Sequence, residues 1–171
     1  MYKRQLFAVN AAKAMGASFV IAIDWDNQTR MDLAKVLGAD LVLGKNDNIV
    51  ESILSHTEGK GVDNSCEFSG SPAALSNAIQ STRMGGYVNI LSVYGNTLTE
   101  VPMNDIVFRY LHVKGINGRK MWATWDKMHE LLNSNKIDIN TLVTHRINYQ
   151  NYPEGIKLAL SGDCGKIVMD F

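Results

Sequence analysis

The sequence predicts an α/β fold in which a doubly wound parallel sheet is covered by helices. Short apolar runs of strand length alternate with helical segments, which is the sequence form of repeated βαβ units. Within a run such as 20–23, apolar residues follow one another without alternation, as expected for strands covered on both faces. No low-complexity linker or internal repeat divides the 171 residues, so one domain is expected.

The boundaries of these elements are indicated by glycine and proline. One Ala-rich helical segment ends at Gly16 and the next at Gly38, because glycine readily adopts the left-handed conformation that closes a helix. Pro72 opens a later helix, and Gly85-Gly86 is expected to separate it from the following strand. The expected helices are 6–15, 29–37, 49–56, 72–84, 106–110, 121–133 and 151–160. The expected strands are 19–24, 40–43, 62–68, 87–91, 112–116 and 166–169.

Composition and charge exclude several classes of protein. Apolar residues make up 46% of the chain and 17 basic residues balance 17 acidic ones, so we expect a globular protein without a general attraction to nucleic acid or anionic lipid. Cys66 and Cys164 are too few for a disulfide framework or a four-cysteine zinc site and suggest a reducing compartment. No apolar run approaches the ~20 residues of a membrane span, and the first residues lack the pattern of a signal peptide. These features predict a cytoplasmic protein with no nucleic-acid or membrane partner.

Asp24 is the first candidate for a functional residue. It closes the apolar run 19–23, and in dinucleotide-binding folds a carboxylate at the end of the second strand accepts hydrogen bonds from the adenosine ribose. Such a carboxylate also repels a 2′-phosphate, which favours NAD over NADP. Arg30 follows at a distance where it can stack on adenine or pair with Asp24. A solvated strand end or helix cap at Asp24, and an ordinary exposed helical arginine at 30, remain open as alternatives.

The glycine-rich phosphate loop of such folds is missing where it is expected. Gly-x-Gly-x-x-Gly should lie just before the first helix, but the chain there reads Met1-Tyr-Lys-Arg-Gln5. Either the fold is a different one or the chain begins after its glycine loop, and the abrupt start of the helix at Leu6 favours the second. We therefore expect residues 1–5 to be a non-native leader. Residues 6–171 are then expected to form a nucleotide-binding domain, truncated at its first βα unit, together with a C-terminal segment.

A set of motifs resembles one protein family in both order and spacing. Leu6-Phe-Ala-Val-Asn-Ala-Ala-Lys-Ala-Met-Gly-Ala17 is similar to the helix that follows the glycine loop in the zinc-containing medium-chain dehydrogenases. The motifs Glu67-Phe-Ser-Gly70, Gly85-Gly86 and Leu91-Ser-Val93 fall where that family has its later cofactor-side strand ends. The more specific motifs are Lys114-Gly-Ile-Asn-Gly-Arg119, Met121, Thr124-Trp125, Thr144-His145-Arg146 and Gly165-Lys166. Their order resembles the L-threonine 3-dehydrogenases within this family, and the resemblance covers nearly all of residues 6–171.

The resemblance implies a Rossmann-type fold that binds NAD, and it implies which residues contact the cofactor. Those on the adenosine side are Asp24 and Arg30, and those on the nicotinamide side are Leu91, Ser92, Val93, Ile116 and Asn117. Compared with some members of the family, this sequence has one additional residue between the acid and the arginine. Arg30 therefore departs from the family's pattern. Three of the nicotinamide-side residues, Leu91, Val93 and Ile116, also fit a plain sheet core. Both interpretations can hold at once, because the backbone atoms of these residues would make the contacts.

The resemblance also implies an activity. In an L-threonine 3-dehydrogenase, the β-hydroxyl of L-threonine is oxidised to give 2-amino-3-oxobutanoate while hydride passes to NAD, and a zinc ion polarises the alcohol oxygen. The zinc ligands and the proton relay are expected outside this chain, so no catalytic or metal-binding residue is predicted here. A homo-oligomer, a tetramer in the family, is expected. The alternatives are another zinc-dependent polyol or alcohol dehydrogenase, of sorbitol or butanediol type, and a standalone nucleotide-binding module without catalysis.

Three further patterns are better explained without a catalytic, metal-binding or ligand-stacking role. Tyr110 and Lys114 have the spacing of the short-chain dehydrogenase pair, but the strand expected at 112–116 prevents them from sharing a helix face. The four histidines and two cysteines contain no closely spaced ligand pair, so no metal site is predicted. Trp122 and Trp125 form an aromatic helix face suited to packing or to a subunit contact.

Overall fold

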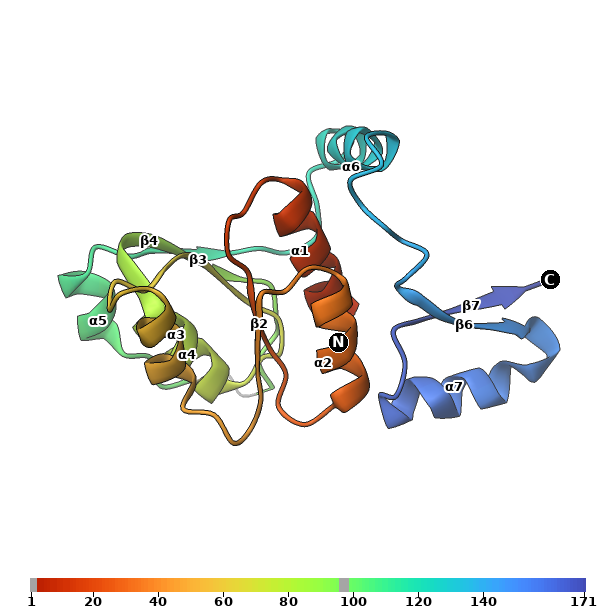
Figure 1. Cartoon of the computed structure of the whole chain (residues 1–171), viewed down its shortest axis with the longest axis horizontal. Coiled ribbons are helices and arrows are strands. Elements are labelled where there is room, and N and C mark those ends of the chain that lie inside the picture. The colour runs from red at the N-terminus through yellow and green to blue at the C-terminus, as the bar shows by residue number, and fades with distance from the viewer. Residues whose placement is uncertain (1–2, 96–98) are drawn as a thin grey trace. The chain divides into compact units, whose positions relative to one another are not determined.

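The computed structural model describes residues 3–95 and 99–171, and the chain divides into two compact units. Asn46–Lys120 is called the central unit here, and Tyr2–Lys45 together with Met121–Phe171 is called the flanking unit. Figure 1 labels helices and strands from both units. Strands within each unit pair only in parallel in the part of the chain that the structure describes.

The N-terminal part of the flanking unit alternates helix and strand. Its elements are α1 (Lys3–Ala14), β1 (Ile21–Ile23), α2 (Gln28–Val36) and β2 (Leu41–Leu43). Strands β1 and β2 pair in parallel, with Ile21 opposite Leu41. Helix α2 begins after Asn27, whose side chain accepts a hydrogen bond from a first-turn backbone amide. The buried core that joins these elements consists of Leu6, Val9, Ala22, Ala34, Leu37 and Leu142.

The C-terminal part of the flanking unit is a second βαβ arrangement that follows helix α6. Its elements are α6 (Ala123–Asn133), β6 (Val143–Asn148), the short 3-10 helix η1 (Tyr149–Asn151), α7 (Tyr152–Ser161) and β7 (Lys166–Asp170). Strands β6 and β7 pair in parallel, with Ile147 opposite Met169. Gly162 adopts a left-handed conformation with φ of 82° directly after α7, which ends the helix and turns the chain toward β7.

The central unit is built on a three-stranded parallel sheet. Its elements are α3 (Ile49–His56), β3 (Val62–Glu67), α4 (Pro72–Ser81), β4 (Thr82–Ile90), α5 (Met103–Phe108) and β5 (His112–Gly115). The strands follow the order β3-β4-β5, and helices α3 and α4 lie side by side (Figure 1). The core of the unit consists of Leu75 and Ile79 from α4, Val88 from β4, and Leu111. Because the strands are parallel, their carboxyl ends lie along one edge of this sheet.

These elements confirm the predicted α/β class, with parallel strands connected through helices. The expected helix 49–56 matches α3 at both ends. Asn48 caps this helix by accepting a hydrogen bond from the Glu51 amide, which is a signal that lies entirely within the local sequence. The expectation of a single nucleotide-binding domain over 6–171 stays a prediction. No helix among residues 3–95 and 99–171 is both long and apolar enough to cross a membrane.

The expected helix 72–84 is too long, and this prediction was wrong at its C-terminal end. Helix α4 stops at Ser81 and strand β4 begins at Thr82, so the two glycines lie within the strand rather than before it. The pairing of β3 with β4 shifts between Val62 and Asn64, and residues 83–86 form the resulting bulge. A side chain at Gly86 would approach the Asp63 carbonyl oxygen to 3.0 Å, so glycine permits this close contact.

Strand β6 was not predicted. Val143, His145 and Ile147 lie at the alternate positions of a strand, but the segment carries the polar residues of the Thr144-His145-Arg146 motif and no continuous apolar run. Its extended conformation depends on pairing with β7, which lies about twenty residues further along the chain.

Candidate functional site

Asp24 and Arg30 form a buried ion pair at the carboxyl end of β1. Arg30 Nε donates to one Asp24 carboxylate oxygen at 2.7 Å, and Nη2 donates to the other at 2.9 Å. The Asp24 side chain is 7% exposed and the Arg30 side chain is 11% exposed, so the pair is largely removed from water. A two-pronged arginine–carboxylate contact fixes both the position and the plane of the carboxylate. The structure therefore realises the Asp24–Arg30 pairing that the sequence analysis left open.

The C-terminal part of the flanking unit contributes to the position of Arg30. Asn27 Nδ2 donates to the Gly162 carbonyl oxygen and to an Asp163 carboxylate oxygen, each at 3.2 Å. Arg30 Nη1 lies 3.4 Å from the same Gly162 carbonyl oxygen. A Cβ atom at Gly162 would lie 2.9 Å from Arg30 Nη1, so a larger residue there would displace the end of the arginine side chain. The turn after α7 thus contacts the arginine that contacts Asp24.

The residues predicted for the nicotinamide side lie at the carboxyl ends of two neighbouring strands of the central unit. Leu91, Ser92 and Val93 follow β4 directly, and Ile116 and Asn117 follow β5 directly. The Ile116 amide donates to the Ile90 carbonyl oxygen at 2.8 Å, which keeps the two strand ends in register. In open α/β sheets, ligands bind outside the carboxyl ends of the strands.

Exposure differs among these residues. Val93 is 83% exposed and Ile116 is 37% exposed, so neither side chain belongs to the sheet core. The interpretation of these positions as plain core is therefore wrong for Val93 and Ile116, because their side chains leave the sheet at its edge. Leu91 is half-buried, and Ser92 is tied to a neighbouring strand through its hydroxyl group. The first group of predicted residues lies in the flanking unit and the second in the central unit.

Glu67 is a functional candidate to which the sequence reasoning assigned no role, although it lies in the Glu67-Phe-Ser-Gly70 motif of the resemblance. It is the last residue of β3 and is 3% exposed. Its carboxylate accepts hydrogen bonds from the hydroxyl groups of Ser69, Ser92 and Tyr94 and from the amides of Ser69 and Gly70. The available signal was a carboxylate at the end of a strand and shortly before Ser69-Gly70, which resembles the Asp24 signal.

The hydrogen bonds around Glu67 control its ionisation. Burial by itself raises the pKa of Glu67, but the hydrogen bonds donated by Ser69, Ser92 and Tyr94 outweigh burial and hold the pKa below its ordinary value of 4.5. Burial and the neighbouring carboxylate raise the pKa of Tyr94 to about 12. At neutral pH the carboxylate is therefore ionised while the phenol remains protonated and able to donate.

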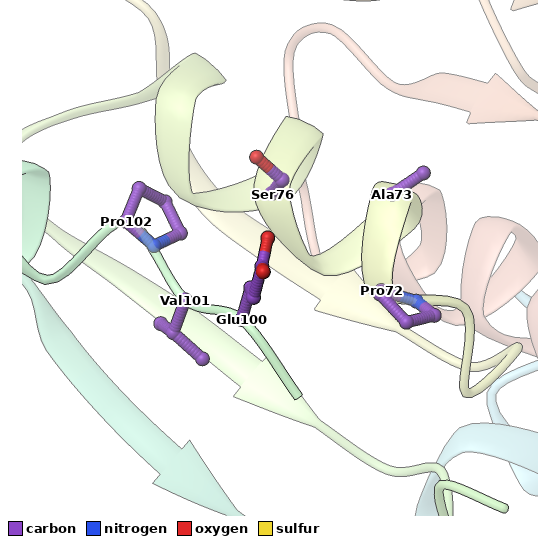
Figure 2. Close-up of a pocket in the computed structure, with 6 residues that line it drawn as sticks. All are labelled: Pro72, Ala73, Ser76, Glu100, Val101 and Pro102. Atoms are coloured by element: carbon purple, nitrogen blue, oxygen red, sulfur yellow. The ribbon is translucent and has the colours of Figure 1, made fainter. Parts of the chain in front are cut away.

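A surface pocket of about 410 Å³ lies elsewhere in the central unit (Figure 2). It is lined by Pro72, Ala73, Ser76, Glu100, Val101 and Pro102. Figure 2 shows the Glu100 carboxylate directed toward helix α4, which carries three of the lining residues. None of the seven predicted cofactor residues lines this pocket. Among residues 3–95 and 99–171, no three His, Cys, Asp or Glu side chains are grouped in a way that could hold a metal ion.

Comparison with known proteins places these features in a family. The family model described as "Zinc-binding dehydrogenase" matches residues 6–134. An L-threonine 3-dehydrogenase from Bacillus licheniformis is 40% identical over 165 residues, and one from Pyrococcus horikoshii is 34% identical over the same number. These matches cover 96% and 95% of this chain but 47% of each relative, so the chain spans about half the length of the curated relatives it matches.

Solved structures show the same fold. The 2R,3R-butanediol dehydrogenase from Bacillus subtilis superposes with a TM-score of 0.84 and 32% identity over 97% of this chain and 48% of that one. An alcohol dehydrogenase from a Thermus species superposes with a TM-score of 0.88 and 26% identity over the same shares of the two chains. Both the sequence and the fold therefore lead to one conclusion: the chain belongs to the zinc-binding dehydrogenase family.

Proposed function

We propose that this chain supplies the NAD-binding part of an NAD-dependent L-threonine 3-dehydrogenase. The observation that carries the proposal is the buried Asp24 carboxylate at the carboxyl end of β1, held by Arg30. The substrate is proposed from the relatives named L-threonine 3-dehydrogenase, at 33–40% identity over nearly the whole chain. The L-threonine and 2-amino-3-oxobutanoate pair is the corresponding substrate and product.

Asp24 has the chemistry to hold the adenosine ribose. An ionised carboxylate offers about four acceptor positions, and Arg30 occupies one on each oxygen, so each oxygen keeps a position for a ribose hydroxyl. The negative charge disfavours a 2′-phosphate at the same place, which supports NAD rather than NADP. Arg30 orients the carboxylate in a largely buried setting.

The ends of β4 and β5 have the geometry to hold the nicotinamide end through backbone groups. Residues 91–93 and 116–117 leave neighbouring strands on the same edge of the sheet. The Leu91 and Ile116 amides still donate to the adjacent strand ends, and the chain leaves the strand ladder after them. Backbone contacts of this kind depend on the position of the segment rather than on its side chains. This is consistent with the high exposure of the Val93 side chain.

Zinc enters the proposal only through the enzyme to which the chain contributes. When bound in such an enzyme, zinc polarises the alcohol oxygen and lowers its pKa, so that hydride can leave. The described residues of this chain do not fit a zinc site, because they contain no suitable cluster of ligands. We therefore assign the metal ligands and the proton relay to the half of the relatives that this chain does not match.

Assembly and compartment complete the proposal. A homo-oligomer, a tetramer by analogy with the resembling family, is supported by the exposed strand β5, which lies at one edge of the β3-β4-β5 sheet. A cytoplasmic location is supported by the two free cysteines, Cys66 and Cys164.

Replacement of Asp24 tests the proposed NAD site. Asp24→Ala removes charge-assisted hydrogen bonds to the ribose, so NAD binding should weaken by roughly tenfold to several hundredfold while the preference for NAD over NADP shrinks. Asp26→Ala is the matched control, because Asp26 is 63% exposed and forms a surface ion pair with Lys45. Both cofactors are titrated against each variant by intrinsic tryptophan fluorescence. An unchanged NAD-to-NADP affinity ratio in Asp24→Ala would show that Asp24 is a structural cap.

A different substrate is the second candidate. The butanediol dehydrogenase superposes at 32% identity, so a polyol or alcohol substrate has independent structural support. The two candidates differ in the substrate that reduces NAD in the enzyme containing this chain. Equal concentrations of L-threonine, 2,3-butanediol and sorbitol are compared by the rate of NADH formation, and the highest kcat/KM identifies the substrate class.

A further inference from the structure

The Glu67 carboxylate connects two segments that are far apart in the sequence. On one side, Oε1 accepts from the Ser69 amide at 2.6 Å, the Ser69 hydroxyl at 2.5 Å and the Gly70 amide at 3.0 Å. On the other side, Oε2 accepts from the hydroxyl groups of Ser92 and Tyr94, the latter at 2.9 Å. Oε2 also accepts from the Gly70 amide at 3.2 Å, so the carboxylate binds both the loop between β3 and α4 and the segment that follows β4.

The two segments are also in close backbone contact. Gly70 has a φ of 77°, and a Cβ atom at this position would lie 2.6 Å from the Val93 carbonyl oxygen. Only glycine combines the left-handed conformation with this approach. The position of residues 92–94 is therefore determined by the loop at Ser69-Gly70 as well as by strand β4.

The strand ladder alone does not determine that position. The last paired residues of β3 and β4 are Glu67 and Ile90, and the Leu91 amide donates to the Glu67 carbonyl oxygen at 2.9 Å. Beyond this bond the chain has left the strand. The Glu67 side chain continues the connection for three more residues, because its carboxylate binds the side chains at 92 and 94.

We propose that Glu67 is a positioning residue that holds segment 92–94 in the conformation required to bind the nicotinamide end of NAD. The inference rests on the proposed function, since it concerns the same coenzyme site. Glu67 does not touch the cofactor in this account. It acts through Ser92 and Tyr94, and its own loop is fixed through Ser69 and Gly70.

The groups that donate hydrogen bonds to the Glu67 carboxylate are all neutral, which makes this carboxylate well suited to hold segment 92–94. Its hydrogen bonds come from N–H and O–H groups, and such bonds to a charged acceptor are roughly twice as strong as neutral ones. Removing one partner from a buried hydrogen-bond network leaves the others without a matching group. The segment after β4 should therefore respond to changes at Glu67 or Tyr94, whereas the strand itself should not.

The test compares NADH with ADP-ribose, which has the same adenosine and phosphates but no nicotinamide ring. In Glu67→Gln, binding of NADH should weaken by about tenfold, while binding of ADP-ribose should stay within about twofold. Tyr94→Phe should act in the same direction with a smaller effect, and the double variant should bind NADH no more weakly than Glu67→Gln alone. Asp63→Asn is the control, because Asp63 lies on the same strand but is 74% exposed. Equal weakening of both ligands, or no weakening of either, would overturn the proposal.

Amide hydrogen exchange without ligand separates this inference from the proposed function. In Glu67→Gln, the amides of residues 92–94 should exchange at least about tenfold faster, while the Val88 amide within β4 should keep its rate. Unchanged rates at 92–94 would overturn the positioning role even if NADH binding fell. If the unmodified chain binds neither NADH nor ADP-ribose, the proposed function fails, and the exchange rates still decide whether Glu67 positions the segment.

Discussion

Asp24 and Glu67 are buried carboxylates at strand ends, and their surroundings give them different roles. Asp24 pairs with a guanidinium group on both oxygens and keeps acceptor positions for a ligand. The Glu67 carboxylate oxygens accept hydrogen bonds from neutral donors of two segments, so its acceptor positions are occupied by groups of the protein itself. A carboxylate at the same kind of position is therefore proposed to bind a ligand in one unit and to position a segment in the other.

Gly70 offers a test of the contact between these segments. Gly70→Ala should destabilise the central unit by more than about 1 kcal/mol, because alanine must adopt positive φ and its Cβ would meet the Val93 carbonyl oxygen. Gly59→Ala is a matched control, since Gly59 has a φ of 75° but no atom within 4 Å of the added Cβ. Both variants are compared by urea denaturation. A Gly70→Ala variant no less stable than Gly59→Ala would contradict the close approach.

At the scale of elements, β5 combines exposure with an unpaired edge. All four of its residues are exposed, and in the sheet formed by described residues it pairs on one side with β4. The Ile116 amide points toward β4, so by the alternation of a strand the amide of Val113 points away from β4. That outward amide is available to another chain.

Replacement of Val113 tests whether this edge takes part in assembly. Val113→Pro removes the outward N–H without removing a bond to β4, so association of the enzyme containing this chain should weaken. Val113→Thr keeps the N–H and a β-branched side chain, and it should associate like the unmodified protein. Light scattering gives the mass of each variant, and circular dichroism checks the fold. A proline variant of unchanged mass with an intact fold would rule out β5 as the contact.

The whole molecule consists of two α/β units, each with parallel strands, and the chain is about half as long as the curated relatives. Asp24 and Arg30 belong to the flanking unit, and the strand ends after β4 and β5 belong to the central unit. Binding of NAD is proposed as a property of this chain, whereas oxidation of threonine is proposed for the enzyme to which it contributes.

This division predicts the behaviour of the chain in an assay. Purified 171-residue chain supplied with threonine, NAD and zinc should bind NAD but form no NADH, because the metal ligands are assigned to the unmatched half of the relatives. NADH fluorescence is the measurement, and the threonine dehydrogenase of Bacillus subtilis is the positive control. NADH formation above that of a protein-free reaction would contradict the assignment.

The sequence by itself determined the α/β class and several local features. Alternation of apolar runs with helical segments predicts the elements because helix and strand differ in the period of their buried residues. Asn48 fixes the start of α3 and Pro72 the start of α4, since these signals act on backbone groups within one helical turn. Asp24 was identifiable because a carboxylate closing an apolar run is visible in the sequence.

Only the tertiary structure decided where α4 ends, that β6 forms, and what Glu67 does. Arg109 donates to the carbonyl oxygens of Gln80 and Thr82, and this cap comes from 27 to 29 residues away. Glu67 meets Ser92 and Tyr94 across 25 and 27 residues. A hydrogen bond across such a separation leaves no periodic pattern near either partner. The sequence therefore shows the donors and the acceptor, and the packing of parallel strands determines that they meet.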